Sequence, residues 1–335
     1  MREVGVGVIG GGWFGEIHMH TLSKLPNAKL VAVCSRREEH AKELASKYGA
    51  KKWYTDMYQL VRDKEIEAVH VVTAEPEHRE PTVAAAENGK HVLVEKPIAT
   101  TLKDADAMIA AAKKANVFFM VAEKLRFDPR YVMAKEEIDK GKVGKILSIY
   151  ARRNVHSKRS IPYLKRVSSI VDDSWHDTDL MLWYTKDKVT EVYADAINMK
   201  GTENPDLGWV MYKFSKGTIG VSEAAWILPD TSPYGIDAKM EILGTEGAIY
   251  LDFAEQGIIV NDKEGWRAPD TYHWPLVHGE RMGDIKEEIS YFINCVMKGQ
   301  KPVIVPPEES RVTLEAVLAA DQSAKTRKLI KLPLK

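Results

Sequence analysis

Residues 4–15 read VGVGVIGGGWFG, and this stretch decides the fold of the N-terminal part of the chain. Val4 to Ile9 form a short apolar run that ends at three glycines, and a helical pattern begins at Phe14. The order is therefore strand, tight turn and helix. Glycines at positions 10, 12 and 15 give the spacing G-x-G-x-x-G in the context that a dinucleotide-binding fold requires.

Each glycine of this loop has a physical reason. Gly10 permits the tight turn, Gly12 lets a pyrophosphate approach the backbone, and Gly15 lets helix and strand pack closely. The N-terminus of the helix then faces the phosphates. The residues expected to bind the cofactor here are Gly10, Gly12, Trp13, Phe14 and Gly15.

The alternation of strand and helix continues along the first third of the chain. Apolar runs typical of buried strands are separated by helical stretches, which predicts a doubly wound parallel sheet. The further predicted strands are 30–34, 68–73, 91–94 and 118–121, and the predicted helices include 38–47 and 104–115. We therefore expect an α/β Rossmann domain over residues 1–122.

After residue 122 the pattern changes. A helix over 128–140 leads into a strand over 146–154 in which apolar and polar residues alternate, so that one face is buried and the other exposed. Further strands are predicted at 189–197, 209–214, 218–226, 237–243, 248–252 and 257–260, and helices at 284–298 and 308–326. Residues 123–335 are predicted to form an α+β domain with a large, open, mostly antiparallel sheet, for substrate binding and oligomerisation.

Composition excludes several classes of partner. The chain has 335 residues, with 48 Lys and Arg against 48 Asp and Glu, so its formal net charge is zero. It lacks the positive field that holds nucleic acid, and no apolar run approaches the roughly 20 residues that span a bilayer, so we expect neither partner. Cys34 and Cys295 are too few for a disulfide framework, which favours the cytoplasm and buried, unpaired thiols.

Ser35-Arg36-Arg37 ends the second predicted strand, where NAD-specific folds place an acidic residue on the ribose 2′-hydroxyl. The hydroxyl of Ser35 and the guanidinium of Arg36 suit a 2′-phosphate instead. We predict NADP as the favoured cofactor. NAD is the alternative if Arg36 turns toward the carboxylates of Glu38 and Glu39.

Glu95-Lys96-Pro97 follows the predicted strand 91–94. Doubly wound folds bind ligands at the carboxyl ends of their strands, which places Lys96 where it can act as a general acid and base. A Lys-Pro pair alone is more often a surface turn, so this interpretation depends on motifs elsewhere in the chain.

Four ordered motifs make the chain resemble the Gfo/Idh/MocA family, which includes glucose-fructose oxidoreductase and inositol dehydrogenase. The resemblance extends over essentially the whole length. Its motifs are Val8–His18, Gly89–Pro97, Arg126–Pro129 ahead of a turn at Gly141–Lys145, and Asp172-x-x-x-His176-x-x-Asp179.

The resemblance implies roles for residues of these motifs. Lys96 corresponds to the catalytic lysine, Glu95 to a ligand of the cofactor ribose, and Pro97 to part of a cis peptide. Asp172 and His176 correspond to residues that hold the reacting substrate. On a helix, their i, i+4 spacing puts both side chains on one face.

Other positions in these motifs are weaker candidates or departures. Asp173 competes with Asp172, although the family spacing counts four residues back from the histidine. Thr73 is a candidate cofactor contact at the nicotinamide side, but the family usually has Pro and Asn where this chain has Ala74-Glu75. Trp175 stands where many members carry a smaller aliphatic residue.

Substrate contacts are also expected from four further residues. Arg126 follows the crossover between the domains, and Asn154 and His156 lie on or just beyond the exposed register of strand 146–154. Tyr234 resembles a substrate-side tyrosine of inositol dehydrogenases. All four are predicted to line the substrate cleft.

These features predict an NAD(P)-dependent oxidoreductase that interconverts a secondary alcohol and a ketone on a sugar or cyclitol, as inositol 2-dehydrogenase does. Lys96, Asp172 and His176 would share the hydroxyl proton while hydride passes to the nicotinamide. A sugar-nucleotide oxidoreductase and a non-catalytic dinucleotide sensor are the alternatives. A zinc site of Asp172, His156 and His176 is a further alternative, but these groups need no ion to bind polyol hydroxyls, so we predict no metal.

The polar-faced sheet with its many aromatic residues predicts a subunit interface. We expect a homo-oligomer, a dimer or a tetramer. Packing in the core or in such an interface is favoured over sugar stacking for Trp209, Trp226, Trp274 and His278.

Overall fold

The computed structural model describes residues 2–253, 257–263 and 265–334, and the chain divides into two compact units. The first unit comprises Met1–Phe127 and His273–Arg311, and the second Asp128–Tyr272 and Val312–Lys335. The boundary predicted at residue 122 lies close to Phe127, where the chain first passes from the first unit to the second. Residues 273–311, which the sequence analysis assigned to the second domain, belong to the first unit.

The first unit contains a six-stranded sheet in the order β3-β2-β1-β4-β5-β6, and every neighbouring pair is parallel. The strands are β1 Val4–Ile9, β2 Ala28–Cys34, β3 Lys52–Tyr54, β4 Ala68–Val71, β5 His91–Glu95 and β6 Phe119–Ala122. The central strands β1 and β4 are buried at every position, as their unbroken apolar runs predict. The predicted Rossmann architecture is confirmed.

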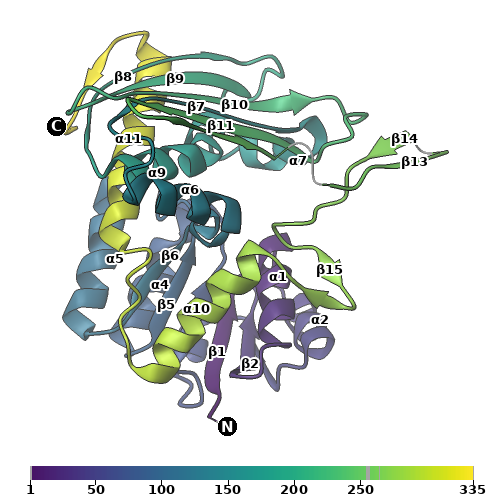
Figure 1. The fold of residues 1–335 in the computed structure, drawn as a ribbon. Helices are drawn as coiled ribbons and strands as arrows, with labels where there is room; N and C mark the ends of the chain where they lie inside the picture. The colour runs from purple at the N-terminus through teal and green to yellow at the C-terminus, as the bar shows by residue number, and fades with distance from the viewer. Residues whose placement is uncertain (1, 254–256, 264, 335) are drawn as a thin grey trace. The chain divides into compact units, whose positions relative to one another are not determined.

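Helices alternate with these strands along the chain (Figure 1). They are α1 Trp13–Leu22, α2 Glu38–Tyr48, α3 Met57–Arg62, α4 Arg79–Glu87, α5 Leu102–Ala115 and α10 Asp284–Lys298, with the 3₁₀ turns η1 Glu75–Glu77 and η2 Lys124–Phe127. Strand β3 and helix α3 were not predicted, because three and six residues are too short to show a periodic signal.

Helix α10 explains why a late segment belongs to the first unit. Its apolar face is buried, and it packs against α1, β1 and η2 (Figure 1). Asn27, ahead of β2, donates a hydrogen bond from Nδ2 to Oδ1 of Asn294 on α10 at 2.8 Å. A contact over so many residues leaves no local signal in the sequence.

The second unit is built on a seven-stranded sheet in the order β12-β11-β7-β10-β9-β8-β17. The strands are β7 Ile146–His156, β8 Val189–Ile197, β9 Leu207–Phe214, β10 Ile219–Leu228, β11 Ile236–Gly244, β12 Ala248–Asp252 and β17 Ile330–Lys331. All pairs are antiparallel except β7 with β10, which are parallel. The prediction of a large, mostly antiparallel sheet is confirmed.

The two faces of this sheet differ. The inner face packs against α8 and α9 and carries buried residues such as Val210 and Tyr212. The outer face carries the alternate residues, among them Tyr150 and Trp209, whose rings stack at 6.0 Å. The remaining helices of this unit are α6 Pro129–Asp139, α7 Ser157–Leu164, α8 Ser169–Asp172 and α9 Ser174–Thr185, and α11 Pro307–Thr326 extends from the first unit into the second.

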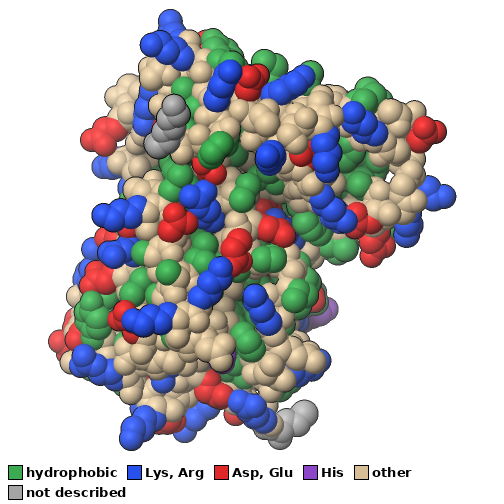
Figure 2. Space-filling model, turned by 90° about the vertical axis from the view of Figure 1, so that its left-hand side faces the viewer, with side chains coloured by type: hydrophobic (Ala, Val, Ile, Leu, Met, Phe, Trp, Pro, Cys, Tyr) green, Lys and Arg blue, Asp and Glu red, His purple; other side chains and the backbone are tan. Residues whose placement is uncertain are grey.

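Short hairpins complete the described chain. They are β13 Val260–Asp262 with β14 Gly265–Arg267, and β15 Leu276–Val277 with β16 Glu280–Arg281. The strand predicted over 257–260 thus begins only at Val260. Among the described residues, no helix has the length and apolar character needed to cross a membrane. Figure 2 shows acidic and basic side chains interspersed over the face in view, in keeping with the zero net charge.

Candidate active site

The glycine loop between β1 and α1 has the geometry that a bound pyrophosphate needs. Gly10 has a φ of +119°, and a Cβ there would lie 2.1 Å from the carbonyl oxygen of Val72. A Cβ on Gly15 would lie 2.1 Å from the carbonyl oxygen of Gly10. At Gly12, by contrast, no described residue other than its chain neighbours lies within 4 Å of the Cβ position. The first N–H groups of a helix have no partner within the helix, so this open space fits a phosphate that approaches α1.

Three aromatic rings gather at the start of α1. Trp13 and Phe14 pack edge to face with their ring centroids 5.0 Å apart. The ring centroid of Trp274 lies 5.2 Å from that of Trp13 and 5.6 Å from that of Phe14. Trp13 remains 46% exposed. The sequence analysis placed Trp13 and Phe14 at the cofactor and Trp274 in the core or an interface. Trp274 in fact lies beside the glycine loop, because residues 273–311 return to the first unit.

The cationic residue after β2 is already paired. Arg36 is 86% exposed, and its guanidinium NH1 lies 3.2 Å from Oε1 of Glu77. Ser35 lies beside it, with Oγ 3.4 Å from Nδ1 of His40. A carboxylate that competes for Arg36 was foreseen, but it comes from the turn after β4 rather than from the start of α2.

A buried histidine links the loops that follow β4 and β5. The ring of His78 lies 3.2 Å from the carbonyl oxygen of Thr73 through Nε2 and 2.9 Å from that of Pro97 through Nδ1. Burial lowers the pKa of His78. The Lys96–Pro97 peptide is cis, as the resemblance implied. The sequence analysis missed His78, whose signal was only a histidine five residues after Thr73.

Glu95 closes β5 directly before Lys96. Its Oε1 lies 2.9 Å from Nε2 of His18 on α1, and its Oε2 accepts a hydrogen bond from the backbone N–H of Lys96 at 3.3 Å. Glu95 and His18 are both buried. The carboxylate expected at the cofactor ribose is therefore held from within the domain.

In the second unit, Asp172 and His176 lie on consecutive helices. Asp172 ends α8, Asp173 interrupts the helix, and α9 begins at Ser174. The predicted single helix is therefore wrong. Asp173 accepts a hydrogen bond from Nε1 of the buried Trp226, which ties the break to β10 and gives this competitor of Asp172 a different task. Asp172 and His176 are 8% and 6% exposed.

A buried ion pair anchors the helix that carries His176. Arg153 on β7 donates from NH2 to Oδ1 of Asp177 at 2.9 Å and to the hydroxyl of Tyr131 at 3.1 Å. Burial raises the pKa of Asp177, and the guanidinium of Arg153 opposes that shift. The pair fixes α9 to the inner face one residue after His176. The sequence analysis missed Arg153, since an arginine in a strand is ordinarily solvent-exposed.

Asn154 lies on the opposite side of the sheet. Its Nδ2 donates to Oε1 of Glu223 at 2.8 Å, and Tyr150 donates to the other oxygen of that carboxylate at 3.2 Å. Because successive strand residues face opposite sides, Asn154 belongs to the outer face while its neighbour Arg153 reaches α9. Asn154 was predicted to lie on an exposed register, but it is buried at 9% exposure, and its amide is directed to Glu223 on the face opposite α9.

The structure brings two other predicted residues together and anchors a third. Nε2 of His156, at the end of β7, lies 2.7 Å from the carbonyl oxygen of Tyr234. Arg126 is buried in the first unit, where it donates to the carbonyl oxygen of Ile304 and pairs with Glu309. These contacts give Arg126 an anchoring task within its own unit.

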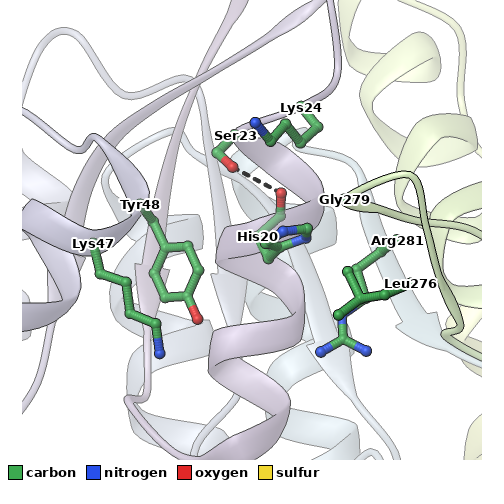
Figure 3. A pocket seen from close by; sticks show the side chains of 8 residues that line it. All are labelled: His20, Ser23, Lys24, Lys47, Tyr48, Leu276, Gly279 and Arg281. Atoms are coloured by element: carbon green, nitrogen blue, oxygen red, sulfur yellow. Dashed lines mark hydrogen bonds between the residues drawn. The ribbon is translucent and has the colours of Figure 1, made fainter.

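A cavity of about 640 Å³ lies away from the glycine loop, at the last turn of α1 (Figure 3). It is lined by His20, Ser23, Lys24, Lys47, Tyr48, Leu276, Gly279 and Arg281. Burial and the nearby cations Arg281 and Lys24 lower the pKa of His20. Basic residues at the C-terminal end of a helix offset its dipole, so their presence here needs no ligand.

Two parts of the chain match models of known protein families. Residues 4–123 match the model described as the Gfo/Idh/MocA oxidoreductase family with an NAD-binding Rossmann fold. Residues 131–250 match the Gfo/Idh/MocA C-terminal domain.

Known proteins are similar over the full length. The chain is 31% identical to myo-inositol 2-dehydrogenase of Thermotoga maritima, over 98% of each chain. It is 30% identical to scyllo-inositol 2-dehydrogenase (NAD⁺) of Bacillus subtilis, over 100% of this chain and 98% of that one. The crystal structure of a probable dehydrogenase from Thermotoga maritima superimposes with a TM-score of 0.84 at 28% identity, covering 98% of this chain and 99% of that one.

Proposed function

Because the chain belongs to the Gfo/Idh/MocA oxidoreductase family, we propose that it oxidises one secondary hydroxyl of a cyclitol to a ketone, as an inositol 2-dehydrogenase does. The predicted family and the predicted oxidoreductase acting on CH–OH groups are confirmed. The observation that carries the choice of a cyclitol is similarity over nearly the whole length to both a myo-inositol and a scyllo-inositol dehydrogenase.

The cofactor follows from the first unit, which carries the NAD-binding Rossmann fold. The open space at Gly12 fits the pyrophosphate, and Trp13, Phe14, Ser35, Thr73 and Glu95 are the further contacts we propose. We keep NADP as the favoured form. The exposed pair of Arg36 with Glu77 is worth only about 0–1 kcal/mol, so a 2′-phosphate can displace the carboxylate.

We assign the proton transfer to Lys96. The cofactor accepts the hydride, and the hydroxyl proton must leave at the same carbon for the ketone to form. A lysine amine in its neutral form takes that proton and returns it in the reverse reaction. Asp172 and His176 bind the reacting hydroxyl and its neighbours, and His156 and Tyr234 bind more distant hydroxyls. No metal ion is required by this scheme.

The test is Lys96→Met, with Lys114→Met on the exposed surface of α5 as the matched control. The Lys96 variant should lose about 10²–10⁴-fold in kcat, because general acid-base catalysis is worth about that much, while NAD(P)H still binds. The control should behave as the parent protein. Near-normal turnover of Lys96→Met would remove the lysine from the mechanism.

The substrate is tested with a panel of cyclitols, sugars and sugar nucleotides, each with NAD⁺ and NADP⁺, followed by nicotinamide absorbance. We expect the highest kcat/KM with an inositol. Preference for a sugar nucleotide would support the alternative enzyme. Cofactor binding without turnover on any member of the panel would support a sensor.

We also propose a cytoplasmic homo-oligomer, in which a second copy covers the outer face of the sheet. That face exposes adjacent large apolar side chains, with Trp209 44% and Met211 48% exposed, and monomers rarely leave such a patch uncovered. Light scattering should give a dimer or tetramer for the parent protein and a smaller species for Met211→Lys. A monomeric parent protein would contradict this assignment.

A further inference from the structure

A chain of three buried side chains lies behind Lys96 in the first unit. Oε1 of Glu95 lies 2.9 Å from Nε2 of His18, and Nδ1 of His18 lies 3.0 Å from Nδ1 of His70. His18 and His70 are fully buried and Glu95 is 8% exposed. The three residues come from α1, β4 and β5, so the contact depends on the packing of the domain.

The hydrogen-bond pattern decides where the protons are. Oε2 of Glu95 accepts a hydrogen bond from the backbone N–H of Lys96. When Oε1 is also an acceptor, Nε2 of His18 carries the proton of their contact. Burial lowers the pKa of His70, so that ring is neutral and carries one proton.

The second contact then fixes both tautomers. Two facing ring nitrogens need one proton between them, and Nε2 of His70 makes no hydrogen bond with any described residue. If Nδ1 of His18 were the donor, the proton of His70 would be left on that buried, unpaired Nε2. A buried N–H without a partner is rare and costly. His70 therefore donates from Nδ1 to His18, and His18 donates from Nε2 to Glu95.

The surroundings explain why the carboxylate needs a donor. The charged and titratable groups near Glu95 or Glu288 include His18, His70, His78, Lys96, Glu123, Lys124 and Asp284. Burial and the nearby carboxylates hold the pKa of Glu288 well above its usual range, which leaves this group neutral. In these acidic surroundings, the N–H of His18 gives Oε1 of Glu95 a side-chain donor.

We propose that His18 is a positioning residue for the cofactor, which holds the carboxylate of Glu95 in its orientation at the end of β5, and that His70 sets the tautomer in which His18 does so. The inference rests on the proposed contact between Glu95 and the cofactor ribose. It does not depend on the identity of the substrate, because its consequences appear in cofactor binding alone.

The test compares His18→Leu, His18→Gln and His70→Leu with His20→Leu, which removes another histidine of α1 away from Glu95. NAD(P)H affinity is titrated by fluorescence from pH 5 to 9 on the full chain without substrate. His18→Leu should move the acid limb of the profile upward by about one pH unit, so that binding at a given pH on that limb is about tenfold weaker than in the parent protein. His18→Gln retains an N–H donor and should recover most of the affinity.

His70→Leu should shift the profile in the same direction by a smaller amount, and His20→Leu should leave it unchanged. A purely structural role for His18 would lower thermal stability without moving the pH profile, and that result would overturn the proposal. If His18→Leu does not fold, an unshifted profile in both His18→Gln and His70→Leu overturns it. Absence of turnover on every polyol would reject the proposed function while leaving this test intact.

Discussion

The glycine loop of the first unit and the helix pair α8–α9 of the second are positioned by different means. Gly10, Gly12 and Gly15 lie within six residues, and the loop is shaped by backbone conformation and by the absence of side chains. The helix pair is held instead by side chains distant in sequence, through Arg153 with Asp177 and Asp173 with Trp226. A site shaped by the backbone is local, whereas a site held by paired side chains depends on the whole fold.

We expect the largest effect from a variant that breaks the ion pair between Arg153 and Asp177, which holds α9. Arg153→Met leaves the carboxylate of Asp177 buried without its partner and should lower the free energy of unfolding by about 3–5 kcal/mol. Urea unfolding measures this change. The double variant Arg153→Met with Asp177→Leu should recover most of the loss, because an apolar pair can replace a buried ion pair. A double variant no more stable than the single one would show that the pair is not the anchor.

The local loop should respond in two separable ways. Gly10→Ala forces a Cβ against the carbonyl oxygen of Val72 at a positive φ and should cost about 2–4 kcal/mol of stability. Gly12→Ala, its matched control, meets open space and should change stability by less than about 1 kcal/mol while weakening NAD(P)H binding at least about tenfold. Equal losses of stability in the two variants would contradict the structural role of Gly10. Unchanged cofactor affinity in Gly12→Ala would contradict the binding role of Gly12.

The smallest effect concerns a surface pair that joins two loops of the first unit. Arg36→Ala should lower the ratio of kcat/KM for NADP over NAD about tenfold, since a phosphate contact worth about 1.5 kcal/mol is lost. Glu77→Gln should raise that ratio a few-fold, because it frees the guanidinium. A parent protein that prefers NAD, or an unchanged ratio in Arg36→Ala, would show that Arg36 does not select the cofactor.

The same comparison explains how far the sequence could be interpreted. The strand before Gly10 and the alternation after it predict the Rossmann sheet, because each element carries its own apolar period. The break at Asp173 was missed because no local pattern marks it, and the indole that binds its carboxylate, that of Trp226, lies 53 residues away. Asn154 was selected because polar and apolar residues alternate along its strand, and Arg153 was missed because the sequence does not show the partner that holds an arginine in the core. His78 had no periodic pattern to mark it.

The late return of residues 273–311 to the first unit also bears on how the protein is made. Phe292 on α10 is fully buried, and its ring centroid lies 5.9 Å from that of His70. The hydrophobic core of the first unit therefore includes a helix from near the end of the chain. During synthesis from the N-terminus, the cofactor half therefore cannot finish folding until most of the protein has been translated. A chain cut short near Phe127 would expose the surface that α10 covers.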